Sequence, residues 1–329
     1  MVTVATWNLE NLYRPGGAFG PRTGEAYDKK LQALAATIDQ IRPDVLGVQE
    51  VGAPEALSDL VERLDGRWHT VLSAVPDGRG IRVGVLSRLE VQASTDVVAV
   101  PKQLSRVPTD DGPDDGPDDG PPAVPKPMTT LGRGILHTRV ATAGGAALDL
   151  LVCHLKSKLI TYPGNRFSPR DEDERARFAG YALFRRTLEA ASLRCWVNGL
   201  LDGRGDQRAV VVCGDLNDEP EAATTQLVLG PSGSEIGTQG ELVPDQGDAW
   251  RLWNLAPRIA ADRRFSRIFR GRRELIDHIL VSRALLERVQ EADALTDRPL
   301  PTVTEEPVRR RDAEDSDHAP VLARLDISS

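Results

Sequence analysis

Short apolar runs recur along the whole 329-residue chain, and they constrain its fold more than any other feature. The runs are rich in Val, Leu and Ile and are bounded by Gly, Pro, Asp and Asn, which is typical of strands. Several are apolar almost throughout, as expected for a sheet that is covered on both faces. We expect strands over Val2–Thr6, Val45–Val48, Ile81–Leu86, Ile135–Val140, Leu148–Cys153, Ala209–Cys213, Leu275–Val281 and Pro320–Ile327.

Helical patterns fall between some of these strands. Glu25–Ile41 has apolar residues at helical spacing and stops before Pro43, and Pro54–Leu64 follows the same logic. Asp171–Val197 is the longest and begins with acids that complement the helix dipole. Because strands dominate both ends of the chain and helices intervene, the sequence predicts an α/β sandwich of two sheets covered by helices.

The net charge of -8 is concentrated in one segment. Residues 110–120 read DDGPDDGPDDG and Pro-rich sequence continues to Pro127, so we expect a disordered, exposed insertion at about 105–128. Its six Asp leave the rest of the chain nearly neutral, and the acidity is no argument against a polyanionic partner.

Several classes of protein are not expected from this sequence. No apolar run approaches the roughly 18 residues that span a bilayer, so we expect no membrane association. The three cysteines show no disulfide framework, and the start of the chain has no signal-peptide pattern. We therefore expect a cytoplasmic protein.

Polar residues gather where the apolar strands end. Alone, each cluster is typical of a turn or a helix cap. Together they place carboxylate and amide oxygens and two histidines at strand ends, and such oxygens suit Mg²⁺ or Mn²⁺ rather than zinc. The clusters are TWNLEN (6–11), PDVLGVQE (43–50), CHLKSK (153–158), GDLNDEP (214–220), IDHILVS (276–282) and SDHAPV (316–321).

This ordered set resembles the endonuclease/exonuclease/phosphatase superfamily, the deoxyribonuclease-I-like fold, from Thr6 to Val321. The resemblance implies one catalytic domain over 1–329, built as a four-layered α/β sandwich with two central, mostly antiparallel sheets flanked by helices. It also implies a rim active site that hydrolyses phosphate esters with Mg²⁺ (or Mn²⁺).

The resemblance also implies a role for each matching residue. In catalysis, His318 is the general base oriented by Asp277, Asp215 and Asn217 position water and phosphate, and His154 stabilises phosphate oxygens. The implied metal residues are Glu50, Asp317, Asn8 and, on a weaker match, Glu10. Arg133 resembles a phosphate-gripping arginine, although a surface strand arginine is nearly as good an interpretation. Lys156 could meet a phosphate backbone, or merely solvate its strand end.

The phosphate ester itself is less constrained. Arg258–Arg273 holds seven arginines and one acid, and Arg267 in this segment is a candidate phosphate-binding residue. The sequence FSRIFRGRRELIDHILVS resembles nucleases of this superfamily. A basic stripe could track a nucleic acid, or its arginines could solvate a hairpin and pair with the acidic insertion. We therefore expect a monomeric nuclease acting on DNA or RNA. The alternatives are an enzyme for a small phosphate ester and an inactive binding module, the latter disfavoured because no catalytic position is visibly replaced.

Overall fold

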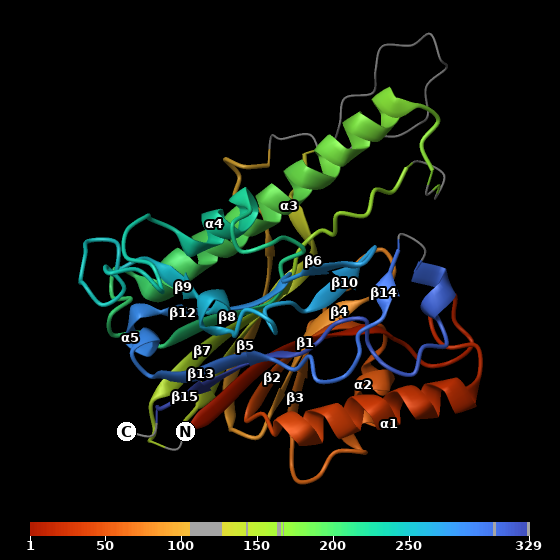
Figure 1. Ribbon diagram of the computed structural model, residues 1–329, viewed down its shortest axis with the longest axis horizontal. Coiled ribbons are helices and arrows are strands. Elements are labelled where there is room, and N and C mark those ends of the chain that lie inside the picture. The colour runs from red at the N-terminus through yellow and green to blue at the C-terminus, as the bar shows by residue number, and fades with distance from the viewer. Residues whose placement is uncertain (106–126, 143, 163–165, 167, 305–306, 328–329) are drawn as a thin grey trace.

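Two six-stranded sheets lie at the centre of the molecule, stacked face to face (Figure 1). The structure is a computed structural model that describes residues 1–105, 127–142, 144–162, 166, 168–304 and 307–327. The insertion expected at about 105–128 therefore lies, apart from its ends, outside the described residues.

The first sheet combines the two ends of the chain. Its neighbouring strands are antiparallel except for β1 and β2, which are parallel. From edge to edge the strands are β13 (Val289–Ala294), β15 (Val321–Leu325), β1 (Val2–Leu12), β2 (Val45–Val51), β4 (Arg82–Ser87) and β3 (His69–Leu72).

The second sheet is built on the same plan from the middle of the chain. Again one pair is parallel, β7 with β8, and the other neighbours are antiparallel. From edge to edge the strands are β5 (Val91–Ala99), β6 (Thr130–Ala141), β7 (Ala147–His154), β8 (Val210–Asp215), β12 (Asp277–Ser282) and β9 (Leu252–Asn254).

A small third sheet lies beside these two. Its strands are β11 (Arg272–Glu274), β10 (Arg267–Phe269) and β14 (Thr302–Val303). β10 and β11 form the hairpin of the arginine-rich segment, and Arg267 makes a single bridge to His318. The hairpin is thereby attached to the loop that precedes β15.

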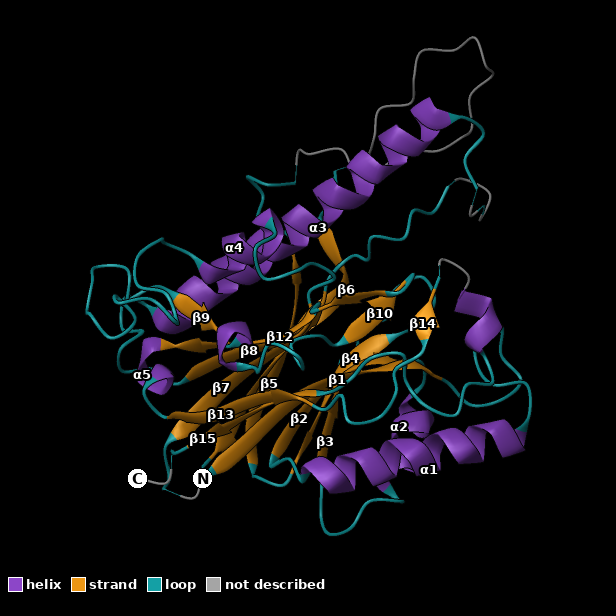
Figure 2. Cartoon of the chain, viewed as in Figure 1, coloured by secondary structure: helices purple, strands orange, loops and turns teal. Residues whose placement is uncertain are grey.

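Helices cover the outer face of each sheet, giving four layers (Figure 2). α1 (Gly24–Ile41) and α2 (Pro54–Val61) pack on the first sheet, and α3 (Glu172–Leu201) and α4 (Ala223–Leu229) lie over the second. Three apolar layers separate them, one between the sheets and one under each set of helices. The remaining helices are α5 (Arg283–Leu286) and the 3-10 turns η2 (Ala256–Arg258) and η3 (Pro307–Arg310).

The expected four-layered sandwich is confirmed, and all eight expected strands occur. Several strands are longer in the structure than expected. β1, for example, continues to Leu12 through polar residues. Within the described part of the chain, no helix is both long enough and apolar enough to cross a membrane.

Candidate active site at the rim of the two sheets

The parallel pair of each sheet ends at a shared rim. Asn8, near the end of β1, donates a hydrogen bond from its Nδ2 to Oδ2 of Asp215, the last residue of β8, at 3.0 Å. His154 ends β7, and its Nε2 lies 3.4 Å from the same Asp215 oxygen. Asp277 starts β12 directly opposite Asp215 in the ladder. Polar strand ends from both sheets therefore meet where the sequence predicts.

Irregular backbone aims these side chains. The β1–β2 register shifts between Asn8 and Leu12, as it does at a β-bulge, and bulges re-aim side chains next to active sites. Positive φ is uncommon in non-glycine residues, and such strained positions gather at functional sites. Four rim residues have it, at φ 48, 55, 62 and 54°: Glu10, Asn11, Glu50 and Asn217.

His318 and Asp277 form a buried acid–base pair that joins the two sheets. His318 Nδ1 lies 2.6 Å from Asp277 Oδ2, and the Asp277 side chain is completely buried. Burial acts to lower the pKa of His318, but the nearby charges of Asp277 and Asp317 raise it to about 10. Since Nδ1 is held by Asp277, Nε2 is the nitrogen left for a substrate or a water molecule.

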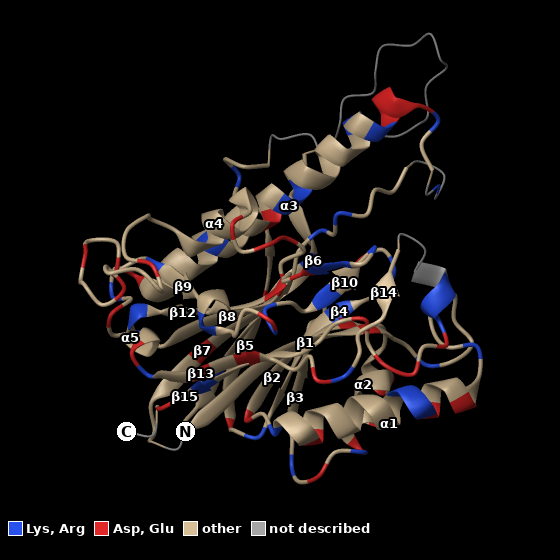
Figure 3. Ribbon diagram, viewed as in Figure 1, with Lys and Arg blue, Asp and Glu red and all other residues tan. Residues whose placement is uncertain are grey.

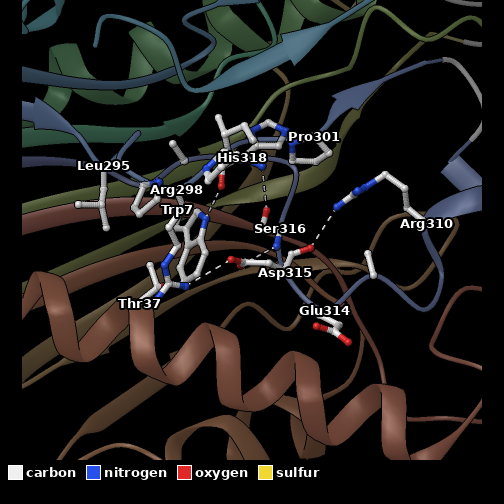
Figure 4. A pocket seen from close by; sticks show the side chains of 15 residues that line it. Trp7, Thr37, Leu295, Arg298, Pro301, Arg310, Glu314, Asp315, Ser316 and His318 are labelled. Carbon is white, nitrogen blue, oxygen red and sulfur yellow. Dashed lines mark hydrogen bonds and ion pairs between the residues drawn. The ribbon is translucent and has the colours of Figure 1, made fainter.

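Three further contacts fix the loop that carries His318. Ser316 Oγ accepts the His318 N–H at 3.0 Å and donates to the Asn8 carbonyl at 2.6 Å. Trp7 Nε1 donates to the His318 carbonyl at 2.8 Å. Behind this loop lies a cavity of about 420 Å³, lined partly by Trp7, Arg298 and Asp315 (Figure 4). The backbone of His318 is thus held to β1, while Asp277 holds its imidazole.

Asp215 is the buried acid at the centre of the rim. Besides the Asn8 amide, it accepts the backbone N–H of Asn217 at 2.8 Å. Burial raises its pKa to about 7, and the charge of Asp277 adds to the rise. The side chain of Asn217 itself donates to the Leu155 carbonyl at 3.0 Å, which fixes the turn after β8.

His154 is a neutral histidine in this setting. Its side chain is 2% exposed, and burial together with the charges of Arg133 and Arg79 lowers its pKa well below the ordinary value. Its Nε2 lies 4.0 Å from Glu50 Oε1, and its Nδ1 is buried without a hydrogen-bond partner among the described residues. The ring therefore faces two acids without being held by either.

Glu50 and Asp317 are the two partly open carboxylates. Glu50 accepts the Asn11 N–H at 2.9 Å through Oε2, which leaves Oε1 toward Arg79 and His154 at 3.7 and 4.0 Å. The Asp317 carboxylate approaches other described side chains only at long range, with Oδ1 4.0 Å from His318 Nε2 and Oδ2 3.9 Å from Arg267 Nε. Both keep oxygen atoms available for a ligand.

Glu10, weighed as a metal residue, has a different set of partners. Arg310 of η3 binds both of its oxygens, at 2.5 and 2.7 Å, and the Asp317 N–H donates to it at 2.9 Å. Burial and the charge of Asp317 raise its pKa to about 7 against the opposing effect of Arg310. In this arrangement Glu10 supports the Asp317 backbone, and no motif in the sequence marks Arg310 as its partner.

The donor atoms fit a hard divalent cation. Asp215, Asp277 and His318 each offer a ligand atom, and these atoms lie within 4.8 Å of one another. Asp277 Oδ1 is buried without a hydrogen-bond partner in the described part of the chain, which an ion would satisfy. Oxygen-rich sites of this kind suit Mg²⁺ or Mn²⁺. This trio differs from the predicted metal set, of which Glu50 and Asp317 keep open oxygens nearby.

Of the three predicted phosphate-binding cations, Arg267 lies at the rim with its guanidinium over the Phe269 ring. Its Nε is buried without a hydrogen bond among the described residues and lies beside Asp317 (Figure 3 shows β10). Lys156 instead turns its ammonium to the carbonyls of Ser157 and Leu159, at 3.1 and 2.7 Å. Burial lowers its pKa to about 7. The Lys156 ammonium therefore binds carbonyl groups of its own loop.

The arginine-rich segment is mostly not a free basic stripe. Arg258 pairs with Glu241 at 2.7 Å, and Arg263 pairs with Asp293 at 2.8 Å. Arg264 donates to the carbonyls of Pro257 and Ile259. These arginines stabilise neighbouring loops through partners other than the acidic insertion, which lies largely outside the described residues.

The site also contains residues that sequence reasoning missed. Asp77 and Arg79 belong to the loop between β3 and β4, where the letters Asp-Gly-Arg-Gly signal only a turn. Arg186 of α3 pairs with Asp218 at 2.9 Å and holds the turn after β8 from the other layer. His278 lies on the opposite face from Asp277, with Nε2 2.8 Å from the Asp218 carbonyl.

Comparisons with known proteins agree with this fold. The model of the Endonuclease/Exonuclease/phosphatase family matches residues 5–318. No curated protein matches the chain at a significant level.

Several solved structures share the fold at low sequence identity. A mannosyl-6-phosphatase from Bacteroides thetaiotaomicron is 18% identical, with a TM-score of 0.55 and 99% of both chains covered. An AP endonuclease from Archaeoglobus fulgidus is 16% identical, with a TM-score of 0.56 and coverage of 99% and 100%. The human nocturnin catalytic domain is 16% identical, with a TM-score of 0.57 and coverage of 98% and 93%.

Proposed function

The chain belongs to the Endonuclease/Exonuclease/phosphatase family of hydrolases, and we propose that it is a Mg²⁺-dependent phosphodiesterase that cuts nucleic acid. The observation that carries the proposal is the buried His318–Asp277 pair, at 2.6 Å, beside Asp215 and the open oxygens of Glu50 and Asp317. A base, a fixed carboxylate partner and unpaired acid oxygens are what metal-assisted phosphodiester hydrolysis requires.

Each residue has a distinct task in this proposal. His318 takes a proton from the attacking water at Nε2, while Asp277 holds Nδ1 and stabilises the imidazolium. Asp215, fixed by Asn8 and Asn217, orients the water. When bound, a divalent cation supplies positive charge that stabilises the phosphoryl oxygens and offsets the acids that keep the His318 pKa high.

Two observations favour nucleic acid as the substrate. Arg267 Nε has no hydrogen-bond partner among the described residues and lies 3.9 Å from Asp317 Oδ2, where a phosphate would lie. Fold relatives include an AP endonuclease and a 3'-5' exonuclease from Neisseria meningitidis. Arginine is well suited to bind phosphate through two parallel hydrogen bonds.

A second candidate function is hydrolysis of a small phosphate ester. It is favoured by the internal pairing of Arg258, Arg263 and Arg264, which leaves less free positive charge for a long polyanion. A mannosyl-6-phosphatase also shares the fold.

A single activity screen separates these functions. The purified chain is incubated with Mg²⁺ or Mn²⁺ and with single- and double-stranded DNA, RNA and small phosphate esters, with Asp215→Ala as the inactive control. Cleavage of nucleic acid that is lost in Asp215→Ala supports the proposal. Turnover of small esters without cleavage of any nucleic acid decides for the second candidate. Absence of both activities and of metal binding by calorimetry would indicate an inactive binding module.

A further inference from the structure

Arg79, on the loop between β3 and β4, uses little of its hydrogen-bonding capacity. Among the described residues its one side-chain hydrogen bond, from NH1 to Asn11 Oδ1, is long at 3.4 Å. NH2 lies 3.7 Å from Glu50 Oε1, and Nε lies 3.9 Å from Asp77 Oδ2. A guanidinium carries five N–H donors, and its side chain here is 33% exposed. Donors therefore remain for a ligand.

The backbone that carries this side chain is firmly held. Asp77 Oδ1 accepts the N–H groups of Arg79 and Ile81, at 2.8 and 3.2 Å. The Tyr13 hydroxyl donates to the Arg79 carbonyl at 2.8 Å. A fixed backbone with an open side-chain end is a preorganised binding group, which loses little freedom when it takes a ligand.

Arg133, the predicted phosphate-gripping arginine, has the opposite character. Its Nε donates to Asp77 Oδ2 at 3.1 Å, and its NH1 donates to the carbonyls of His154 and Leu155 at 3.4 and 3.1 Å. Its side chain is only 11% exposed. Arg133 therefore braces the end of β7 and the Asp77 turn through Nε and NH1, and it is much less exposed than Arg79.

Arg79 also faces the reacting centre. Glu50 Oε1 is a common neighbour, 3.7 Å from Arg79 and 4.0 Å from His154 Nε2. A phosphate held among Glu50, His154 and Asp215 would thus lie within reach of the guanidinium. Arg267 occupies the corresponding position beside Asp317.

We infer that Arg79 binds a non-bridging phosphate oxygen of the substrate on the Glu50 side of the rim, in the role that the sequence suggested for Arg133. The inference rests on the proposed phosphoesterase function and adds a substrate-binding residue to it. Two arginines, Arg79 and Arg267, would then hold one phosphate from different sides of the carboxylates.

The test compares Arg79→Ala and Arg79→Lys with the parent chain in the presence of Mg²⁺. Bis(p-nitrophenyl) phosphate and the best substrate of the activity screen serve as probes. Loss of one donor to the reacting phosphate typically lowers the rate about 10²- to 10³-fold, and we expect kcat/KM of Arg79→Ala to fall by that factor. Added guanidinium should restore part of the rate, and Arg79→Lys should retain part because it keeps the charge.

Arg88→Ala is the matched control, because Arg88 stacks on Trp68 away from the rim and should leave kcat/KM unchanged. An unchanged kcat/KM in Arg79→Ala would overturn the inference. So would a loss accompanied by a lower melting temperature and weaker activation by Mg²⁺ without guanidinium rescue, because Arg79 would then only position Glu50.

The failure of the proposed function is read separately, through binding of inorganic phosphate by calorimetry with Mg²⁺ present. If the parent chain is inactive but binds phosphate more tightly than Arg79→Ala, the inference stands without the hydrolase proposal. If the parent chain binds no phosphate, the inference is wrong.

Discussion

Asp277 and His318 come from different sheets, so their contact depends on how the two sheets stack. Asp277 begins β12 of the second sheet, and His318 lies in the loop before β15 of the first. Neither Asp277 Oδ1 nor the Nε2 face of His318 is committed to a partner at hydrogen-bond distance in the described residues. The hydrogen bond between His318 Nδ1 and Asp277 Oδ2 therefore holds the pair together, while Asp277 Oδ1 and His318 Nε2 remain open to a ligand or substrate.

Replacement of either member should abolish most of the activity. We expect His318→Ala to lower the metal-dependent hydrolysis rate about 10²- to 10⁴-fold, the usual contribution of a general base. Asp277→Asn should cost a similar factor, because the amide favours the wrong tautomer of the imidazole. Steady-state kinetics on the best substrate measures both. His278→Asn, on the opposite face of the same strand, is the comparison, and an equal loss there would contradict the assignment.

A second residue-scale prediction concerns pH and stability away from the rim. Burial acts to raise the pKa of Asp149, but hydrogen bonds from His137 and Arg139 lower it below the ordinary value. A carboxyl with a lowered folded-state pKa stabilises the fold above its unfolded pKa of about 4, and this contribution is lost as the pH falls through the folded value.

Asp149→Asn should therefore lower the free energy of unfolding at neutral pH, with a difference from the parent chain that shrinks toward about pH 3. Urea unfolding followed by circular dichroism at several pH values measures the difference. A difference that stays constant with pH would show that the carboxylate charge of Asp149 does not stabilise the fold.

The types of residue at the rim were predictable from the sequence, but their hydrogen-bond and ion-pair partners were not. The strand-end clusters containing Glu50, Asp215 and Asp317 stand out because polar side chains interrupt apolar runs. Whether a cation is free is decided by carbonyl and carboxylate groups distant in sequence. Arg133 donates to such distant groups, and Lys156 donates to carbonyls of its own loop. Arg79 lies in a turn with no apolar pattern to mark it.

At the scale of elements, β8 carries Asp215 to the rim only because its neighbour can approach closely. Gly214 has φ +141°, and a side chain there would overlap with the Cys153 carbonyl of β7. The parallel β7–β8 pair thus needs glycine one residue before the central acid. The glycine is required directly before the acid, which explains why Gly-Asp-Leu-Asn can be recognised as one motif in the sequence.

Two glycine-to-alanine substitutions should therefore have opposite effects. Gly214→Ala should destabilise the chain by more than about 1 kcal/mol, since alanine cannot adopt that backbone without strain. Gly180→Ala, in α3 with open space around it, should stabilise it by about 0.5–1 kcal/mol. Urea unfolding measures both changes. Destabilisation by Gly180→Ala, or a neutral Gly214→Ala, would show that packing rather than backbone conformation dominates at these positions.

The sequence missed two kinds of strand. β5 and β13, with nine and six residues, lie at sheet edges and are interrupted by polar residues, so no apolar run marks them. The other missed strands are short. β9, β10 and β11 have three residues each and β14 has two, which is too short for an alternating pattern to stand out. β1 extends beyond its predicted end because a bulge lets polar residues continue the strand. The long, periodic helices were predicted to within a few residues at most of their ends.

At the scale of the whole molecule, the buried acids gathered at the rim oppose the stability of the folded chain. Asp215 and Glu10 have pKa values raised to about 7, chiefly by burial, with a further contribution from neighbouring acids. A folded chain that holds such acids together gains stability from any ligand that binds them in the native state only. The sheets converge on this cluster from both halves of the chain, so the gain should appear in global unfolding rather than in a local segment.

Mg²⁺ should accordingly raise the melting temperature of the parent chain, and chelation should reverse the effect. At about 100 times the dissociation constant, the expected gain in unfolding free energy is about 2.7 kcal/mol. Glu50→Gln should reduce the shift, whereas Glu291→Gln, in an exposed ion pair with Arg324, should not. Both variants keep the acidic run at 110–120, so the difference between their shifts reports the rim rather than that run. Equal shifts in scanning calorimetry would place the cation elsewhere and would remove Glu50 from the metal-binding residues.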